Sequence, residues 1–408
     1  MKYKALVSFA GSSMFLSVAQ LIANIMVIRW VSPAELGIWH TVVVLKSYAL
    51  ILNLGVSNGL NRELPFLLGR KHVRLARSVA ESALFISLAA STLTFLIFSS
   101  WAFIEADRGV KISLFVVAVV SAVSFLNIYY GTTFRTNQAF LLFSKINAVL
   151  AGIEIATLFL PAFYGFFGFL ARLVIVELLK LALFLRFQPF PVLPRFHWWS
   201  FKFLIGTGVP LFISSYLSTI TETFKRVILK GVSSFEMVGL FAPALAIYTI
   251  NSLFPQTLGR YIFPRLNHGI GQGRSLRELW IKNLRFSFLS MVLIAPVVIV
   301  GWFLVPHAIQ LLFPEYLEGS RATQIALLSG LFMPFSMLMN FFHATKHWRS
   351  IYTLVAVKLA LFFSIQWTFV RIMPPLSGIA YGTLIAHAVY AVAITIFGFW
   401  YVKRLSAR

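Results

Sequence analysis

The sequence predicts an all-α polytopic membrane protein with about 12 transmembrane helices in two six-helix bundles. Of the 408 residues, 59% are hydrophobic and only 12% are charged. Soluble domains are typically about 45–50% apolar and about 25% charged. Apolar stretches long enough to cross a bilayer follow one another along the chain, and two short motifs recur in its second half. The composition excludes a water-soluble enzyme, a disordered chain and a fibrous one.

The net charge of +23 comes from 35 Lys and Arg against 12 Asp and Glu. In a soluble protein this surplus would suggest a nucleic-acid partner, but the apolar fraction excludes that interpretation. The chain has no cysteine, so it has neither disulfides nor thiolate metal sites. We therefore expect no nucleic-acid partner and no metal site.

The individual spans are predicted from apolar stretches that end at charged residues, Pro or Gly. They are 6–29, 37–57, 78–101, 110–130, 142–162, 166–187, 203–224, 237–260, 284–305, 321–341, 350–371 and 378–401. The first is too long for the apolar core of a signal peptide, so we expect it to be retained. Pro161, Gly165 and Gly168 predict the turn between the fifth and sixth spans.

Most of the basic residues fall in loops on one side of the membrane if the N-terminus is cytoplasmic. The positive-inside rule then places both termini in the cytoplasm. Four cations remain within the predicted spans: Lys46, Arg172, Lys180 and Lys358. The positive-inside rule does not account for the positions of these four residues, because they lie within spans and not in loops.

An internal repeat divides the chain into two halves, residues 1–200 and 201–408. VSPAELGIW near residue 31 is similar to VSSFEMVGLF near residue 232, and Pro65 and Pro264 also correspond at an offset of about 200 residues. Because six spans is an even number, both halves run in the same sense, as parallel repeats related by an axis along the membrane normal. The Pro-rich linker 188–200 joins them.

Polar residues follow one face of several spans. They are Ser13, Ser17, Gln20 and Asn24; Lys46, Asn53 and Ser57; Thr207, Ser214, Ser218, Thr221 and Lys225; and Thr249, Ser252, Gln256 and Arg260. Small polar residues also serve close helix packing in membranes. Since the stripes occur in equivalent spans of the two halves, we favour a shared water-filled cavity.

Charged residues within spans are costly and usually functional. Lys46 lies near the middle of its span, so it either lines a substrate cavity or extends to the interface; the same alternatives apply to Lys358. Glu177 and Lys180 are spaced to pair on one helix, and Glu154 could pair with Arg172 or act as a coupling carboxylate. The cations outnumber the acids, which favours an anionic substrate.

Several segments resemble the polysaccharide (O-antigen) flippase branch of the multidrug/oligosaccharidyl-lipid/polysaccharide exporter superfamily. They are VSPAELGIW, LNLGVSNGLNRELPFLLGR (52–70), FLIGTGVPLFISSYLSTITETFKRVIL (203–229), FEMVGLFAPALAI (235–247) and HAIQLLFPEYLEGS (307–320). The resemblance implies a V-shaped pair of bundles that moves an undecaprenyl-pyrophosphate-linked oligosaccharide across the membrane by alternating access. Lys225 stands where the family often has Asp.

We therefore expect a flippase in the bacterial cytoplasmic (inner) membrane, with coupling to H⁺ or Na⁺ as an open question and no other cofactor. The expected partners are the anionic lipid-linked oligosaccharide, membrane lipids and polysaccharide polymerase or export proteins. The candidate substrate-binding residues are Lys46, Arg172, Lys180, Lys225, Arg260, Lys358, Gln20, Asn24, Asn53 and Gln256, and the candidate ion-coupling residues are Glu154 and Glu222.

Two alternatives remain. A cation-coupled multidrug exporter of the same superfamily would normally need an acid in the first half's cavity; the first span has none, but Glu154 leaves this alternative open. A membrane enzyme, such as a glycosyltransferase or polymerase, would need a catalytic cluster. The sequence has no HExxH, GxSxG or carboxylate-rich motif, so we expect no catalytic residue.

Overall fold

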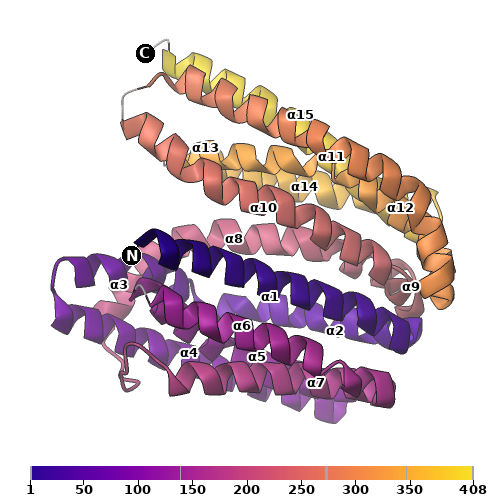
Figure 1. Ribbon diagram of the computed structural model, residues 1–408, viewed down its shortest axis with the longest axis horizontal. Coiled ribbons are helices and arrows are strands. Elements are labelled where there is room, and N and C mark those ends of the chain that lie inside the picture. The colour runs from indigo at the N-terminus through magenta and orange to yellow at the C-terminus, as the bar shows by residue number, and fades with distance from the viewer. Residues whose placement is uncertain (1, 138, 272–273, 346, 407–408) are drawn as a thin grey trace. The chain divides into compact units, whose positions relative to one another are not determined.

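The computed structural model of the protein describes residues 2–137, 139–271, 274–345 and 347–406. Helices are the only regular secondary structure in these ranges (Figure 1). The chain divides into two compact units, Met1–Tyr216 and Leu217–Arg408. The division falls inside one long helix, α8 (Trp198–Val232), rather than in the linker before it.

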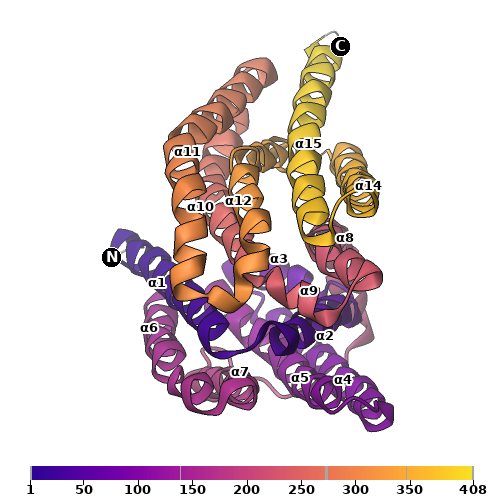
Figure 2. The same cartoon turned by 90° about the vertical axis from the view of Figure 1, so that its right-hand side faces the viewer.

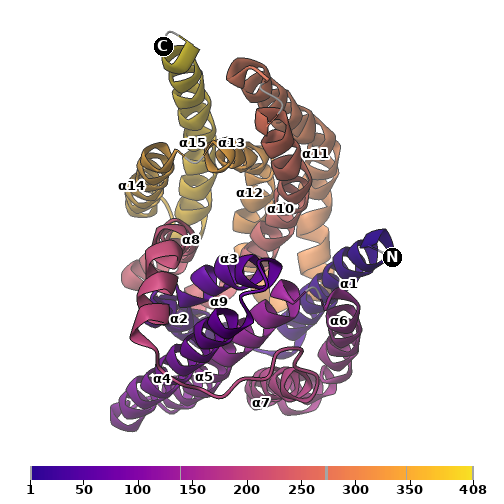
Figure 3. The same cartoon turned by 90° about the vertical axis from the view of Figure 1, so that its left-hand side faces the viewer.

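The first unit contains the helices that precede α8 and the beginning of α8 itself. They are α1 (Lys2–Trp30), α2 (Pro33–Ala49), η1 (Leu50–Asn53), α3 (Val56–Gly69), α4 (Val73–Ile104), α5 (Arg108–Thr136), α6 (Phe140–Ala156) and α7 (Phe159–Arg186). Helices α4 and α5 lie side by side, as do α1 and α6 (Figures 1 and 3).

The second unit contains the rest of α8 and all later helices. They are α9 (Phe235–Leu240), α10 (Ala242–Gly271), α11 (Leu276–Leu312), η2 (Pro314–Gly319), α12 (Ser320–Ser329), η3 (Met333–Leu338), α13 (Met339–Ala344), α14 (Trp348–Ile372) and α15 (Pro375–Ser406). Helices α14 and α15 pack against each other (Figure 2).

The predicted spans fall on the helices of the structure, which has only helices as regular secondary structure in the described ranges, and this confirms the predicted fold class. Within the described ranges, nine helices are long and apolar enough to cross a membrane. A tenth is added if Pro314–Ser329 and Met333–Ala344, which meet at 42°, form one bent span. Helices α6 and α7 are not among these candidates. Helix α6 has only 17 residues, and α7 is kinked and contains several charged side chains.

The turn between the fifth and sixth spans lies earlier than predicted. Helix α6 ends at Ala156 and α7 begins at Phe159, so Pro161 falls in the first turn of α7. Proline is tolerated there because the first helical N–H groups have no partner within the helix. Gly165 (φ 53°, ψ −131°) instead produces a kink inside α7.

The second span is also broken, between α2 and α3. Leu54 (φ 51°) and Gly55 (φ 75°) both adopt the left-handed conformation there. Asn53 Oδ1 accepts a hydrogen bond from the Ser57 N–H at 2.9 Å, which satisfies one free donor at the start of α3. The apolar candidate span ends at Asn53, four residues before its predicted end at residue 57, and α3 follows as a separate helix to Gly69.

Hydrogen bonds from buried side chains join neighbouring helices in each unit. In α4 the buried Ala80 carbonyl accepts a hydrogen bond from Tyr129 of α5 at 3.2 Å. In the second unit, Gln366 Nε2 of α14 donates to Thr383 Oγ1 of α15 at 3.0 Å, and both side chains are buried. Close approach and interhelical hydrogen bonds are the main attractive terms between helices in lipid.

Candidate functional site

A charged cluster in the first unit connects α2 with α7. Lys46 Nζ lies 3.5 Å from Glu177 Oε1, and Lys180 Nζ lies 3.9 Å from Glu177 Oε2. Asn127 of α5 also donates to Glu177 Oε2, at 2.6 Å. The Glu177–Lys180 pair agrees with the prediction from their spacing. The anion that Lys46 requires is therefore Glu177, from a different span.

The three charged side chains of this cluster are partly exposed. Their side-chain exposures are 28% for Lys46, 21% for Glu177 and 33% for Lys180. With two lysines and one glutamate, the cluster has one formal positive charge in excess. We name it the α2–α7 triad.

A second ion pair in the first unit is almost closed to solvent. Arg172 of α7 donates to Glu154 of α6, and their side chains are only 3% and 9% exposed. Gln20 of α1 donates to the other carboxylate oxygen of Glu154 at 3.0 Å. The pair is neutral and joins α1, α6 and α7, so the alternative in which Glu154 pairs with Arg172 is the one observed.

A triad of the same composition occurs in the second unit. Glu222 of α8 contacts Lys225 of the same helix at 3.1 Å and Lys358 of α14 at 3.4 Å. The exposures are 47% for Glu222, 6% for Lys225 and 17% for Lys358. Again two lysines share one carboxylate and leave one positive charge in excess. We name it the α8–α14 triad.

Aromatic rings surround the lysines of the α8–α14 triad. Lys225 Nζ lies 4.5 Å from the centre of the Tyr248 ring, and Lys358 Nζ lies 5.3 Å from that of Phe362. Cations gain electrostatic stabilisation over ring faces, more so where water is excluded. The rings orient the ammonium groups without neutralising them, and Glu222 has the most exposed side chain of the triad.

The uncharged candidates are distributed over several environments. Asn24 is exposed, and Gln20 binds Glu154. Asn53 is buried and caps α3, so its observed contact is structural. Gln256 lines a cavity of about 370 Å³ with Ser336 and Asn340. The side chain of Arg260 lies outside the described residues.

Sequence reasoning missed the pairing between spans. It identified Lys46, Lys225 and Lys358 as separate cations and treated Glu177 as a partner of Lys180 alone. The contacts between α2 and α7 and between α8 and α14 depend on tertiary packing. The only signal in the sequence is that acids within spans are few, so each has to serve several cations.

The fold is that of known transporters. An inward-facing multidrug resistance MATE family transporter of the MOP superfamily matches 99% of this chain and 99% of its own, with a TM-score of 0.78 and 13% identity. A MOP superfamily transporter from Pyrococcus furiosus, described as having a binding pocket of reverse polarity, matches 99% of this chain and 96% of its own (TM-score 0.69, 16% identity).

A flippase has the same fold. The lipid II flippase MurJ, in an inward closed conformation, matches 95% of this chain and 86% of its own, with a TM-score of 0.68 and 16% identity. No protein-family profile matches the sequence, and no curated protein matches it. The likenesses therefore establish the MOP-superfamily fold and do not distinguish its polysaccharide branch.

Proposed function

We propose that the protein is a flippase that moves an undecaprenyl-pyrophosphate-linked oligosaccharide across the bacterial inner membrane by alternating access. The observation that supports this most is the presence of one Lys–Glu–Lys triad in each unit. Each triad has an excess positive charge and an accessible side. A diphosphate, which cannot cross hydrocarbon unpaired, is the kind of group that such sites would stabilise.

The lysines of the two triads are the proposed contacts for the diphosphate. An ammonium group donates to phosphate oxygens as a compact point charge, and it can exchange its glutamate partner for a phosphate. Arg172 belongs to a buried pair, so we assign it to holding α6 and α7 together while the substrate passes. Gln20, Asn24, Asn53, Gln256 and Arg260 remain proposed donors to sugar hydroxyls.

The location and partners follow from the same proposal. The loops predicted on one side of the membrane carry most of the Lys and Arg residues, which fits a protein of the bacterial cytoplasmic membrane with both termini inside. The oligosaccharide would be delivered to polysaccharide polymerase or export proteins, and membrane lipids would surround the polyprenyl tail. Coupling to H⁺ or Na⁺ would use Glu154 or Glu222.

A cation-coupled multidrug exporter of the same superfamily is the second candidate. The exposed carboxylate of Glu222 favours it, because 47% of that side chain is accessible even though it contacts two lysines. An organic cation could compete with those lysines for the carboxylate. The fold supports both candidates equally, because the solved structures with this fold include a MATE transporter (TM-score 0.78) as well as the flippase MurJ (TM-score 0.68).

The experiment uses purified full-length protein in liposomes with two substrates in parallel: a fluorescent polyprenyl-diphosphate oligosaccharide and a cationic dye. We expect transbilayer movement of the lipid-linked sugar and no dye transport. Lys46→Gln combined with Lys180→Gln should slow flipping by about tenfold for each lysine, the value of one lost charged hydrogen bond. Lys111→Gln, at an exposed helix start, is the matched control.

A cellular assay complements the liposomes. Lys46→Ala should abolish polymer export while leaving membrane insertion intact. Dye transport without movement of the lipid-linked sugar would reject the flippase and support the drug exporter. Unchanged movement of the sugar in the double variant would reject the role of the α2–α7 triad. Equal effects of Lys111→Gln and the double variant would instead show that bulk charge, and not the α2–α7 triad, determines the rate.

A further inference from the structure

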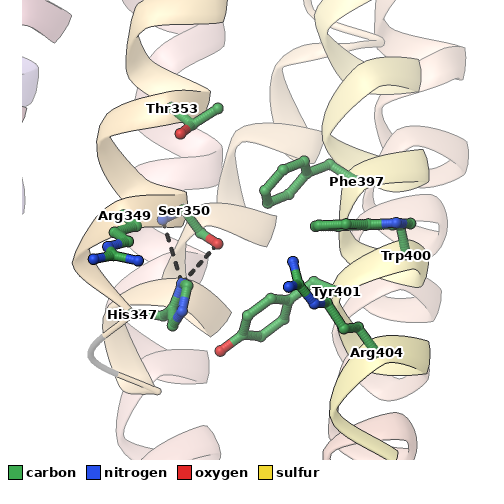
Figure 4. A pocket seen from close by; sticks show the side chains of 8 residues that line it. All are labelled: His347, Arg349, Ser350, Thr353, Phe397, Trp400, Tyr401 and Arg404. Carbon is green, nitrogen blue, oxygen red and sulfur yellow. Dashed lines mark hydrogen bonds between the residues drawn. The ribbon is translucent and has the colours of Figure 1, made fainter. Parts of the chain in front are cut away.

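A cavity of about 350 Å³ lies between the start of α14 and the end of α15 (Figure 4). Its polar lining comes from both helices: His347, Arg349 and Ser350 on the α14 side, and Trp400, Tyr401 and Arg404 on the α15 side. The cavity is separate from both triads and has no role in the proposed transport.

Contacts between buried side chains fix the inner part of the cavity. Ser350 and Tyr401 are only 3% and 6% exposed, and the Tyr401 ring centre lies 4.8 Å from that of His347. His347 Nδ1 accepts a hydrogen bond from the Ser350 N–H at 3.3 Å, as the cap of α14. Because Nδ1 is an acceptor, the proton of the neutral ring is on Nε2, which leaves Nε2 as a donor.

The two arginines give the cavity its charge. Among the described residues, no carboxylate pairs with Arg349 or Arg404. The Arg404 guanidinium lies 5.4 Å from the centre of the Trp400 ring, which orients it without neutralising it. The start of α14 adds the partial positive charge of a helix N-terminus. The Arg404 guanidinium, a ring N–H and a helix start together match the oxygens of a phosphate group, and Arg349, which points outward from the start of α14, adds positive charge at the rim (Figure 4).

An apolar surface leads to the cavity along α15. Val389, Val392, Ile396 and Trp400 follow steps of three and four, so they share one face of the helix. All four are exposed, and Ile396 is the most accessible at 63%. A soluble phosphate would make no contact with this apolar surface, whereas the acyl chains of a phospholipid would cover it.

We propose that this cavity binds the phosphate of an anionic phospholipid headgroup, with the acyl chains along the exposed face of α15. The sequence predicts that these helix ends lie at the cytoplasmic interface, where basic pockets between helices meet anionic headgroups. The site is a lipid-binding site beside the transport path, and it does not depend on which substrate the protein transports.

The test uses the full-length protein in a neutral detergent, with bound lipid counted by native mass spectrometry. Phosphatidylglycerol, phosphatidylcholine and inorganic phosphate are titrated separately. We expect phosphatidylglycerol to bind most tightly. Arg349→Gln and Arg404→Gln should each weaken its binding by about fivefold, the typical contribution of one basic residue at an anionic headgroup. Lys403→Gln should change it by less than about twofold.

Lys403 is the matched control because it is exposed, lies in the same last turn as Arg404 and does not line the cavity. Equal losses for Lys403→Gln and Arg404→Gln would overturn the proposal, as would equal binding of the two lipids. Displacement of phosphatidylglycerol by an equal concentration of inorganic phosphate would assign the site to soluble phosphate and reject the lipid. Since no transport is measured, these results stay distinct from those of the flippase test.

Discussion

The ion pair of Glu154 and Arg172 differs from the two triads in burial and in net charge. It is nearly closed to solvent and neutral, and Gln20 satisfies the second carboxylate oxygen. Burial of a charge without a partner is far more costly than burial of a pair. The triads are more exposed, and each retains one formal positive charge, which is why the proposed function assigns the substrate to them and not to this pair.

The first prediction concerns this pair. Arg172→Gln alone should lower the free energy of unfolding by about 3–5 kcal/mol, since it leaves the Glu154 carboxylate buried without its cation. Glu154→Gln combined with Arg172→Gln should recover most of that loss. Thermal and denaturant unfolding in detergent would measure both, with Arg62→Gln, an exposed residue 4.0 Å from Glu63, as the control. Additive losses in the double variant would contradict the assignment.

At the scale of helices, the sequence predicted the all-helical fold and most of the long apolar helices, but not the breaks between and within them. Hydropathy detects length and apolar character, so it could not show that Leu54 adopts a left-handed conformation or that Gly165 kinks α7. It also could not pair Lys46 with Glu177, because that contact depends on how α2 and α7 pack. The pair of Glu177 and Lys180 was predictable because both lie on one helix.

Helices α3 and α8 come into backbone contact at glycines within the first unit. A Cβ atom on Gly208 would collide with the backbone of Gly55, and one on Gly59 with the backbone of Leu204. Gly206, two residues before Gly208 on the same helix, has open space around it. The effect of a glycine-to-alanine substitution on α8 should therefore depend on its position: Gly208 lies in the contact with α3, and Gly206 does not.

The second prediction follows from this contact. Gly208→Ala should destabilise the protein by about 1–3 kcal/mol, because an extra methyl group in a tightly packed interface forces the backbones apart. Gly206→Ala should be neutral or slightly stabilising, because alanine favours the helix. Thermal unfolding of the two purified variants measures the difference. Equal effects would show that α3 and α8 are not in close contact at this position.

At the scale of the whole chain, the two halves share a helix start as well as a sequence motif. Ser32 caps α2 in a capping box with Glu35, and Ser234 caps α9 by accepting a hydrogen bond from the Met237 N–H at 3.3 Å. The cap in the second half is one residue later than the motif alignment implies, consistent with the extra residue before Gly239. A serine cap at the same place in both halves supports the proposed duplication.

The third prediction tests the orientation of the chain. Because the protein has no cysteine, a single introduced cysteine is the only thiol. Ala106→Cys and Leu193→Cys, both exposed, lie in loops that the positive-inside rule places on opposite sides. A membrane-impermeant maleimide should label Ala106→Cys in intact cells and Leu193→Cys only after lysis. The reverse pattern would mean that both termini face outward.

The linker 188–200, including the first residues of α8, is held to α4 of the first unit by side-chain contacts. His197 Nε2 lies 3.0 Å from Glu81 Oε2, and Ser200 Oγ lies 2.8 Å from Ser78 Oγ, both on α4. Residues of α8 up to Tyr216 belong to that same unit. The second sequence half, residues 201–408, therefore contributes its first 16 residues to the first compact unit. A protease cut near Pro194 would separate the polypeptide into two pieces while leaving the downstream piece inserted in the upstream one.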